Sequence, residues 1–240
     1  MIKFFRHIRK SLLGEGKTKR YFLYGIGEIA LVVIGILIAL QINNWNEKRK
    51  LKSIEIILLT DISEDLKESY KEINEVMKFN DSSITKNKII SNALISDLPY
   101  FNQLDSLFAA VRNWSSPYLT YTAYETLKSK GIDLITNKEL KKGIINIYES
   151  EYAYLTKDYD GSEWLLAQTV YPLTIKHIRK IDYFRAKPND YELLKKNDEF
   201  INMLNEVIDM RQSGIYTMKR IAKRTQNLID SINKEIESRK

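Results

Sequence analysis

A single uninterrupted hydrophobic stretch stands near the beginning of the chain. Between Ile26 and Ile42 the one ionisable side chain is Glu28, and residues 29–40 are all isoleucine, leucine, valine, alanine or glycine. With the helical rise of about 1.5 Å per residue, residues 24–45 span about 31 Å, which is close to the hydrocarbon thickness of a bilayer. The pattern therefore predicts one transmembrane helix, at about residues 24–45.

Aromatic residues flank this stretch on both sides. Tyr21 and Tyr24 stand at its beginning and Trp45 at its end. Because tyrosine and tryptophan favour the headgroup level, we expect these three side chains to be membrane-interface anchors. A buried core helix is one alternative, which the aromatic and basic flanks disfavour. A cleaved signal peptide is another, but residues 39–43 lack the small-x-small pair of a cleavage site.

The rest of the chain has the three-and-four spacing of amphipathic helices. Residues 53–240 contain four glycines and four prolines, and no clean alternating strand. The spacing predicts a first helix over 59–77, broken at 80–83, and a long last helix over 200–236. We expect an all-α protein, in which one N-terminal transmembrane helix precedes an antiparallel helical-bundle-like soluble domain at 46–240.

Local signals predict where the shorter helices begin and end. Thr122 with Glu125, and Thr136 with Glu139, have the spacing of capping boxes. Gly131 suits the position after a helix C-terminus. Residues 160–161, Asp-Gly, predict a turn, Pro172 predicts a helix end or a kink, and residues 185–190 predict a polar loop.

The net charge of +7 is concentrated around the hydrophobic stretch. Residues 1–52 hold eleven Lys/Arg against three Asp/Glu, a net +8, whereas residues 53–240 hold 27 against 28, a net −1. A nucleic-acid footprint needs a basic stripe on the folded domain, so we expect no nucleic-acid partner. The basic residues before the span predict a cytoplasmic N-terminus and an extracytoplasmic domain, periplasmic in a Gram-negative cell.

Residues 1–20 form a basic cytoplasmic tail with an amphipathic pattern. Its apolar residues recur at helical spacing: Ile2, Phe5, Ile8 and Leu12. This pattern suits a short helix on an anionic inner leaflet. The alternative is a disordered basic tag that only sets the topology.

Three residues of the predicted span share one helix face. Glu28, Gly35 and Ala39 are separated by seven and four positions. Small residues four apart allow backbones to approach closely, and a carboxyl group in such an interface can donate a hydrogen bond when it is protonated. The face predicts helix–helix association, in a homo-oligomer or with a partner transmembrane helix. The alternative is that Glu28 extends to the membrane surface near Lys19 and Arg20.

The sequence of this span resembles that of a known family. Residues 24–47, YGIGEIALVVIGILIALQINNWNE, are similar to the N-terminal signature of uncharacterised bacterial single-pass inner-membrane proteins, a domain of unknown function. Ala123–Gly131, followed by Leu134-Ile135 and Asn137-x-Glu139-Leu140, resembles the same family. The resemblance implies a Gram-negative inner-membrane protein. It transfers no activity and no catalytic residue.

Motifs for catalysis are missing from the sequence. The chain has no Cys and two His, His7 and His177, neither of which lies in a ligand cluster. It contains no HExxH, P-loop, GxGxxG or GxSxG motif, and no Glu-x-x-His of the ferritin type. We therefore expect no catalytic residue, no metal site and no cofactor, and a protein that is not an enzyme.

An aromatic cluster is the one candidate for a pocket or partner groove. It consists of Trp114, Tyr118, Tyr121 and Tyr124. The alternative is that these side chains are core, with hydroxyls that reach the surface.

The sequence favours a membrane-anchored protein that acts by interaction, as a scaffold, an assembly factor or a sensory module. A ligand-binding or enzymatic periplasmic domain is the alternative. An accessory subunit of a membrane complex is a third reading. The lipid bilayer is the partner that every one of these readings shares.

Overall fold

The computed structural model describes residues 18–239. The chain divides into two compact units, Met1–Ile54 and Glu55–Lys240. The described part of the first unit belongs to one helix, α2 (Thr18–Ile95), which also supplies the first helix of the second unit. The basic tail falls at residues 1–17, outside the described residues, except for its last three positions, which begin α2.

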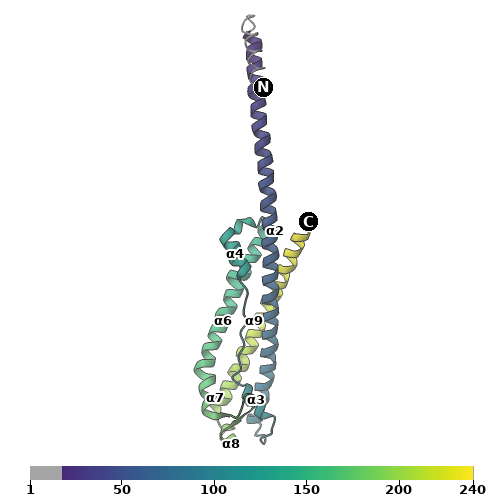
Figure 1. The fold of residues 1–240 in the computed structure, drawn as a ribbon. Helices are drawn as coiled ribbons and strands as arrows, with labels where there is room; N and C mark the ends of the chain where they lie inside the picture. Colours follow the sequence, from purple (N-terminus) through teal and green to yellow (C-terminus); the bar gives the residue numbers. More distant parts are fainter. Residues whose placement is uncertain (1–17, 240) are drawn as a thin grey trace. The chain divides into compact units, whose positions relative to one another are not determined.

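Helices make up most of the second unit, as the sequence predicted (Figure 1). After α2 the elements are α3 (Leu104–Ala110), α4 (Thr122–Lys130), η1 (Ile132–Leu134), α5 (Lys138–Asn146), η2 (Ile147–Tyr152), α6 (Ala153–Leu165), η3 (Leu166–Val170), α7 (Tyr171–His177), β1 (Ile178–Lys180), β2 (Ala186–Pro188), α8 (Tyr191–Leu194) and α9 (Asp198–Glu237). The prediction of an all-α protein is confirmed, with one small hairpin added to it.

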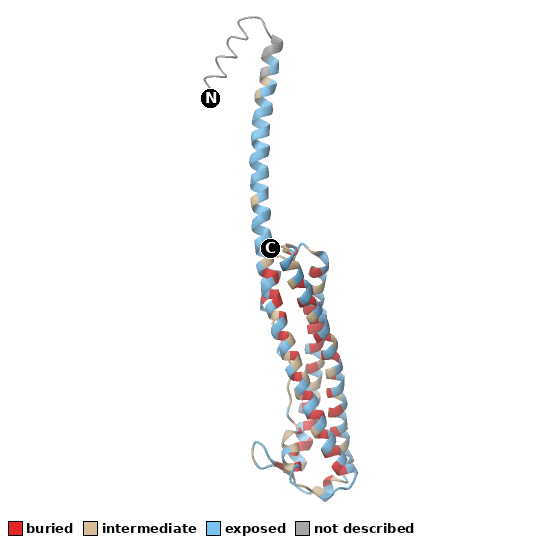
Figure 2. Ribbon diagram, turned by 90° about the vertical axis from the view of Figure 1, so that its right-hand side faces the viewer, coloured by how far each residue is buried: buried red, intermediate tan, exposed pale blue. Residues whose placement is uncertain are grey.

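Helices α2 and α9 run antiparallel through this unit. Ser63 donates to Asn233 at 3.0 Å and Ser91 donates to Asn205 at 3.1 Å, so residue numbers rise along one helix as they fall along the other. The α5–α7 segment lies beside them (Figure 1). Apolar side chains fill the space between these helices in two clusters, and Figure 2 shows the buried residues on their inner faces.

The predicted break at residues 80–83 is wrong, because α2 continues to Ile95. Asn80 is 1 % exposed, its amide donates to the Tyr159 hydroxyl at 3.0 Å, and its carbonyl accepts from Arg211 at 2.7 Å. Asparagine disfavours helices because its side chain can hydrogen-bond to the nearby backbone. Here the amide of Asn80 forms its hydrogen bonds with distant residues instead.

The predicted turn at residues 160–161 is also wrong. Both residues lie inside α6, which belongs to an unbroken helical segment from Lys138 to His177. Two π-helical stretches, η2 and η3, interrupt its α-helical register. Pro172 stands in the first turn of α7, directly after η3, where a missing backbone N–H is tolerated.

Neither predicted capping box forms. The N-cap of α4 is Tyr121, whose side chain caps nothing, and the Ala123 N–H donates to Asp65 of α2 at 2.6 Å. The N-cap of α5 is Asn137, whose side chain accepts from the backbone N–H groups of Glu139 and Leu140. Thr136 instead donates its N–H to Glu55 at 2.7 Å. Gly131 does follow the end of α4, with a φ of 107° that favours glycine.

The predicted loop at residues 185–190 contains a strand. β1 and β2 pair antiparallel, with Ile178 opposite Pro188 and Lys180 opposite Ala186. Each strand has three residues, which is too short for an alternating pattern to be recognised. The hairpin packs Ala186 into the apolar cluster around α3 and α7.

Candidate functional site

Within the first unit, α2 presents a continuous apolar surface. The large apolar residues from Ile26 to Ile42 are all exposed, and the most apolar 18-residue window contains no buried residue. By length and composition this helix can cross a membrane. It contains the predicted span at residues 24–45.

The residues predicted for helix–helix association lie on this exposed segment. A side chain added at Gly35 would meet nothing within 4 Å, and Ala39 is exposed. Glu28 is half-buried on the same helix face. Association through this face stays a prediction.

The predicted interface anchors also belong to α2. Trp45 is exposed, and the Arg49 guanidinium lies 5.4 Å from the centre of its ring. The side chains of Tyr21 and Tyr24 lie outside the described ones. Their role as anchors stays a prediction.

The structure divides the predicted aromatic cluster between different surroundings. Tyr121 and Tyr124 contact the buried Tyr148, with ring centres 5.6 and 4.4 Å apart. Trp114 contacts Tyr159 at 5.6 Å. Tyr118 is 84 % exposed and belongs to neither contact. A pocket formed by all four residues stays a prediction.

The tyrosine cluster around Tyr148 is largely buried. Burial is the larger cause, and the hydrogen bond that Tyr124 donates to Glu149 at 2.9 Å is the second; together they raise the pKa of Tyr124 to about 12. Burial also raises the pKa values of Tyr121, Tyr148 and Tyr152. These phenols therefore stay neutral at physiological pH, and their rings serve as core.

Two buried carboxylates are each bound by arginine. Glu55 accepts from Arg239, and Glu151 accepts from Arg220 and Arg224. A buried carboxylate requires such partners because the charged form is costly in a medium of low polarity. Their lone pairs are occupied within the domain.

Arg211 is a buried cation of a different kind. Its guanidinium donates to Asn80 at 2.7 Å and to the Asn113 carbonyl at 2.6 Å, and it lies 5.2 Å from the Trp114 ring centre. Among the described residues it has no ion pair, and its Nε has no hydrogen-bond partner. Burial lowers its pKa to about 10, so it stays charged at neutral pH.

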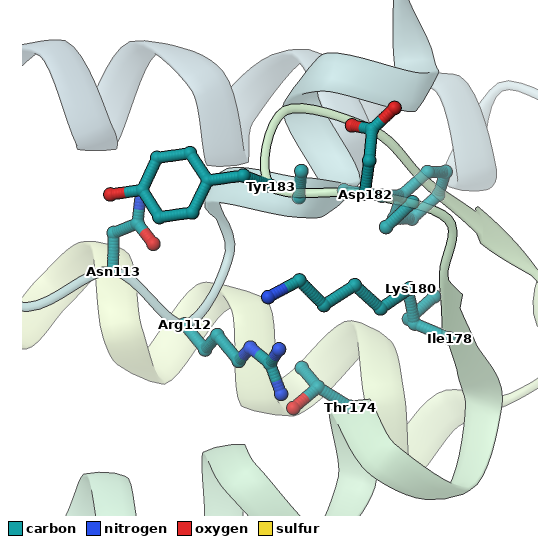
Figure 3. A pocket seen from close by; sticks show the side chains of 10 residues that line it. Arg112, Asn113, Thr174, Ile178, Lys180, Asp182 and Tyr183 are labelled. Carbon is teal, nitrogen blue, oxygen red and sulfur yellow. The ribbon is translucent and has the colours of Figure 1, made fainter.

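A small basic pocket lies beside Arg211, between α3, α7 and the β1–β2 hairpin. The cavity has a volume of about 100 Å³. Its walls are formed by Phe108, Ala109, Arg112, Asn113, Thr174, Ile178, Lys180, Asp182, Tyr183 and Ala186. In Figure 3 the side chains of Lys180 and Arg112 extend into the same space from opposite elements.

The one carboxylate of this pocket is already occupied. Asp182 accepts from the backbone N–H groups of Phe184 and Arg185 at 2.8 Å, and the Arg185 guanidinium binds it at 2.7 Å. The guanidinium and the Phe184 N–H lower the pKa of Asp182, which keeps it ionised. Figure 3 shows its carboxylate directed away from Lys180.

The sequence analysis did not predict this pocket. Arg112 follows a short helix, and Lys180 lies in a strand of three residues that the periodicity does not reveal. The two residues are 68 positions apart and meet only because the hairpin folds against α3. The excess of positive charge in Ile178-Arg-Lys180 was the available signal.

Groups that would bind a metal do not occur among residues 18–239: no three His, Cys, Asp or Glu side chains come together there. The basic pocket is lined by two cations, Arg112 and Lys180, together with Asp182 and neutral side chains.

Comparison with known proteins identifies a family and nothing closer. Residues 28–208, more than half of the chain, match the family of unknown function DUF6090, and the chain belongs to this family. No curated protein matches. No solved structure matches either.

Proposed function

We propose that this member of the DUF6090 family is a single-pass inner-membrane protein of a Gram-negative cell whose helical domain acts by binding, as a scaffold or sensory module. The observation that carries the proposal is the apolar part of α2, where large hydrophobic side chains are exposed over the length of a bilayer. In water such a surface would drive aggregation, whereas in lipid it is the favoured state.

The charge distribution supports one orientation of the span. The seven basic residues of positions 1–20 are opposed by one acidic residue, Glu15, and the flank after the span is less basic. The positive-inside rule places the N-terminus in the cytoplasm and Glu55–Lys240 in the periplasm.

Binding is proposed rather than catalysis because of what fills the domain. Its buried carboxylates are bound by arginines, and its buried phenols are held neutral. A general acid or base needs a pKa near the working pH and a free position beside substrate. Besides apolar side chains and tyrosines, the buried residues of the described part are one arginine, two glutamates bound by arginines, and neutral serine, threonine and asparagine side chains.

The test is membrane extraction of a span variant. Arginine at both Val33 and Leu37 opposes insertion by about 2.5–3.5 kcal/mol each. We expect the wild-type protein to resist alkaline carbonate and to float with lipid, and the V33R/L37R variant to leave the membrane fraction. The matched control is Leu51→Arg, outside the predicted span, which should behave as wild type.

Retention of the double variant in the carbonate-resistant fraction would contradict the anchor. Orientation is read separately, by the accessibility of a C-terminal tag to protease added to spheroplasts. We expect cleavage without lysis, and a tag protected until lysis would refute the periplasmic assignment.

A further inference from the structure

The basic pocket beside the hairpin combines two cations that have no ion pair among the described residues. Arg112 and Lys180 come from different elements and extend into one cavity (Figure 3). Surface cations usually avoid each other or take a carboxylate partner, because like charges repel. Here the one carboxylate in the wall, Asp182, is bound by Arg185.

The surroundings of the cavity are positive as well. Asp105, the acidic residue of α3, is bound by Lys187 at 3.5 Å and by the Tyr100 hydroxyl at 2.5 Å. Behind the wall, the Arg211 guanidinium donates to the carbonyl of Asn113, which lines the cavity. A buried charge without a counter-ion raises the local potential, so an anion in the cavity is favoured.

We propose that this pocket binds a phosphate group, carried either by a small phosphomonoester or by a phospholipid headgroup. A guanidinium offers paired donors and an ammonium offers a point charge, which together suit a tetrahedral dianion. The Asn113 side chain stands at the same cavity and adds a neutral donor.

The size of the cavity limits what enters it. A volume of about 100 Å³ equals that of roughly three water molecules. A phosphate group fits this space, and the rest of the ligand has to leave through the mouth. The pocket therefore recognises the end of a ligand.

Exposed aromatic residues lie next to the cavity: Tyr183 lines it, and Phe184 follows in the chain. Tyr183 and Phe184 are 79 % and 73 % exposed and meet edge to face at 5.0 Å. The Lys180 ammonium lies 5.8 Å from the centre of the Tyr183 ring, so this ring joins the cation to the apolar tip. Such a rim suits an aromatic or acyl group attached to the phosphate.

The test uses the full chain in nanodiscs of neutral phosphatidylcholine. Titration calorimetry at constant ionic strength measures the Kd for inorganic phosphate, for phenyl phosphate and for acetate. We expect saturable binding of both phosphates and weaker binding of acetate. Lys180→Gln and Arg112→Gln should each raise the Kd for phosphate about tenfold or more, because each removes a charge-assisted contact.

Matched variants separate recognition from folding. Arg179→Gln removes the neighbouring cation, which is exposed and does not line the cavity, and should change the Kd less than about twofold. Lys180→Arg keeps the charge and should bind phosphate. It is the variant to compare with wild type if Lys180→Gln does not fold. Tyr183→Ser should weaken phenyl phosphate and spare inorganic phosphate.

Pelleting with vesicles identifies the source of the phosphate group. If nanodiscs bind vesicles that contain phosphatidic acid, and inorganic phosphate displaces them, the ligand is a lipid headgroup. If phenyl phosphate binds while the vesicles do not, the ligand is a soluble phosphomonoester. Absence of saturable phosphate binding, acetate bound as tightly as phosphate, or an unchanged Kd in the folded Lys180→Gln protein would overturn the proposal.

Discussion

Arg211 carries a positive charge into the interior of the second unit, where its side chain is 1 % exposed. Its two terminal nitrogens join α9 to Asn80 of α2 and to the backbone at Asn113. The rings of Phe79 and Trp114 lie 5.7 and 5.2 Å away and supply cation–π attraction. The residue is thus a cross-link between three segments, stabilised without a carboxylate.

Replacing Arg211 by lysine should destabilise the fold although the charge is kept. The guanidinium is a planar fork that reaches two acceptors, and one ammonium cannot replace it. Either the side-chain oxygen of Asn80 or the backbone carbonyl of Asn113 therefore loses its donor. We expect the free energy of unfolding in detergent to fall by about 2–4 kcal/mol. Urea unfolding of the full chain measures it. Lys219→Arg, an exposed exchange on the same helix, should stay within about 0.5 kcal/mol, and an equally small change for Arg211→Lys would refute the cross-link.

Single residues also show where the sequence misled. Asn80 and Gly161 are helix breakers by local preference, and both lie inside helices. Thr122 and Thr136 have the spacing of caps but do not cap. For Asn80 and at the starts of α4 and α5, the hydrogen-bond partners are residues far away in the chain, which no local pattern contains.

At the scale of elements, α2 organises the segment between α3 and α4 through its polar side chains. Glu72 accepts from the Tyr118 N–H at 3.4 Å, Ser69 from the Thr120 N–H at 2.9 Å, and Asp65 from the Ala123 N–H at 2.6 Å. The acceptors move back along α2 as the donors move forward, so this segment runs antiparallel to the helix. These side chains of α2 satisfy backbone N–H groups of an irregular segment that does not belong to a sheet.

Asp65 provides the sharpest test of this arrangement. Burial raises the pKa of Asp65, and repulsion from Glu68, Asp61 and Glu64 raises it further, so the charged form is unfavourable. Its carboxylate oxygen is nevertheless the acceptor for the Ala123 N–H. Asp65→Ala should lower the free energy of unfolding by about 1–3 kcal/mol, because the Ala123 N–H loses its acceptor.

Two variants on the same helix serve as comparisons. Asp65→Asn keeps an acceptor and should retain most of the stability, and the exposed Asp61→Ala should have little effect. Hydrogen exchange of the Ala123 amide should speed up in Asp65→Ala only. If Asp65→Asn lowered the free energy of unfolding as much as Asp65→Ala, the charge of Asp65 and not its hydrogen bond to Ala123 would be the stabilising feature.

The long elements were predictable and their assembly was not. Leu59, Ile62 and Leu66 of α2, and Phe200, Leu204 and Val207 of α9, have the helical spacing and are buried as expected. The ends of α4 at Gly131 and of α9 near Ile236 also follow from the sequence. The hairpin and the basic pocket depend on packing between α3 and β2, which periodicity cannot supply.

At the scale of the whole molecule, the first unit differs in kind from the second. Buried apolar clusters stabilise the helices of the second unit. The described part of the first unit is a single helix with its apolar residues exposed. A lone helix of this composition is stabilised by its surroundings, lipid or another helix, because the described residues of the first unit provide no core.

Whether that surrounding includes a second helix is decided at the face of Glu28, Gly35 and Ala39. A leucine at Gly35 has room on the isolated helix, since nothing lies within 4 Å of an added Cβ, so it should leave the helix and its insertion intact. It would separate two backbones packed at this point and weaken association roughly threefold to tenfold. In-cell crosslinking followed by affinity purification should recover a homo-oligomer or a partner from wild type and less of it from Gly35→Leu. Val33→Leu, on the opposite side of the helix, is the matched control. If all three proteins give the same crosslinked species, the span is only an anchor, and binding belongs to the domain that follows it.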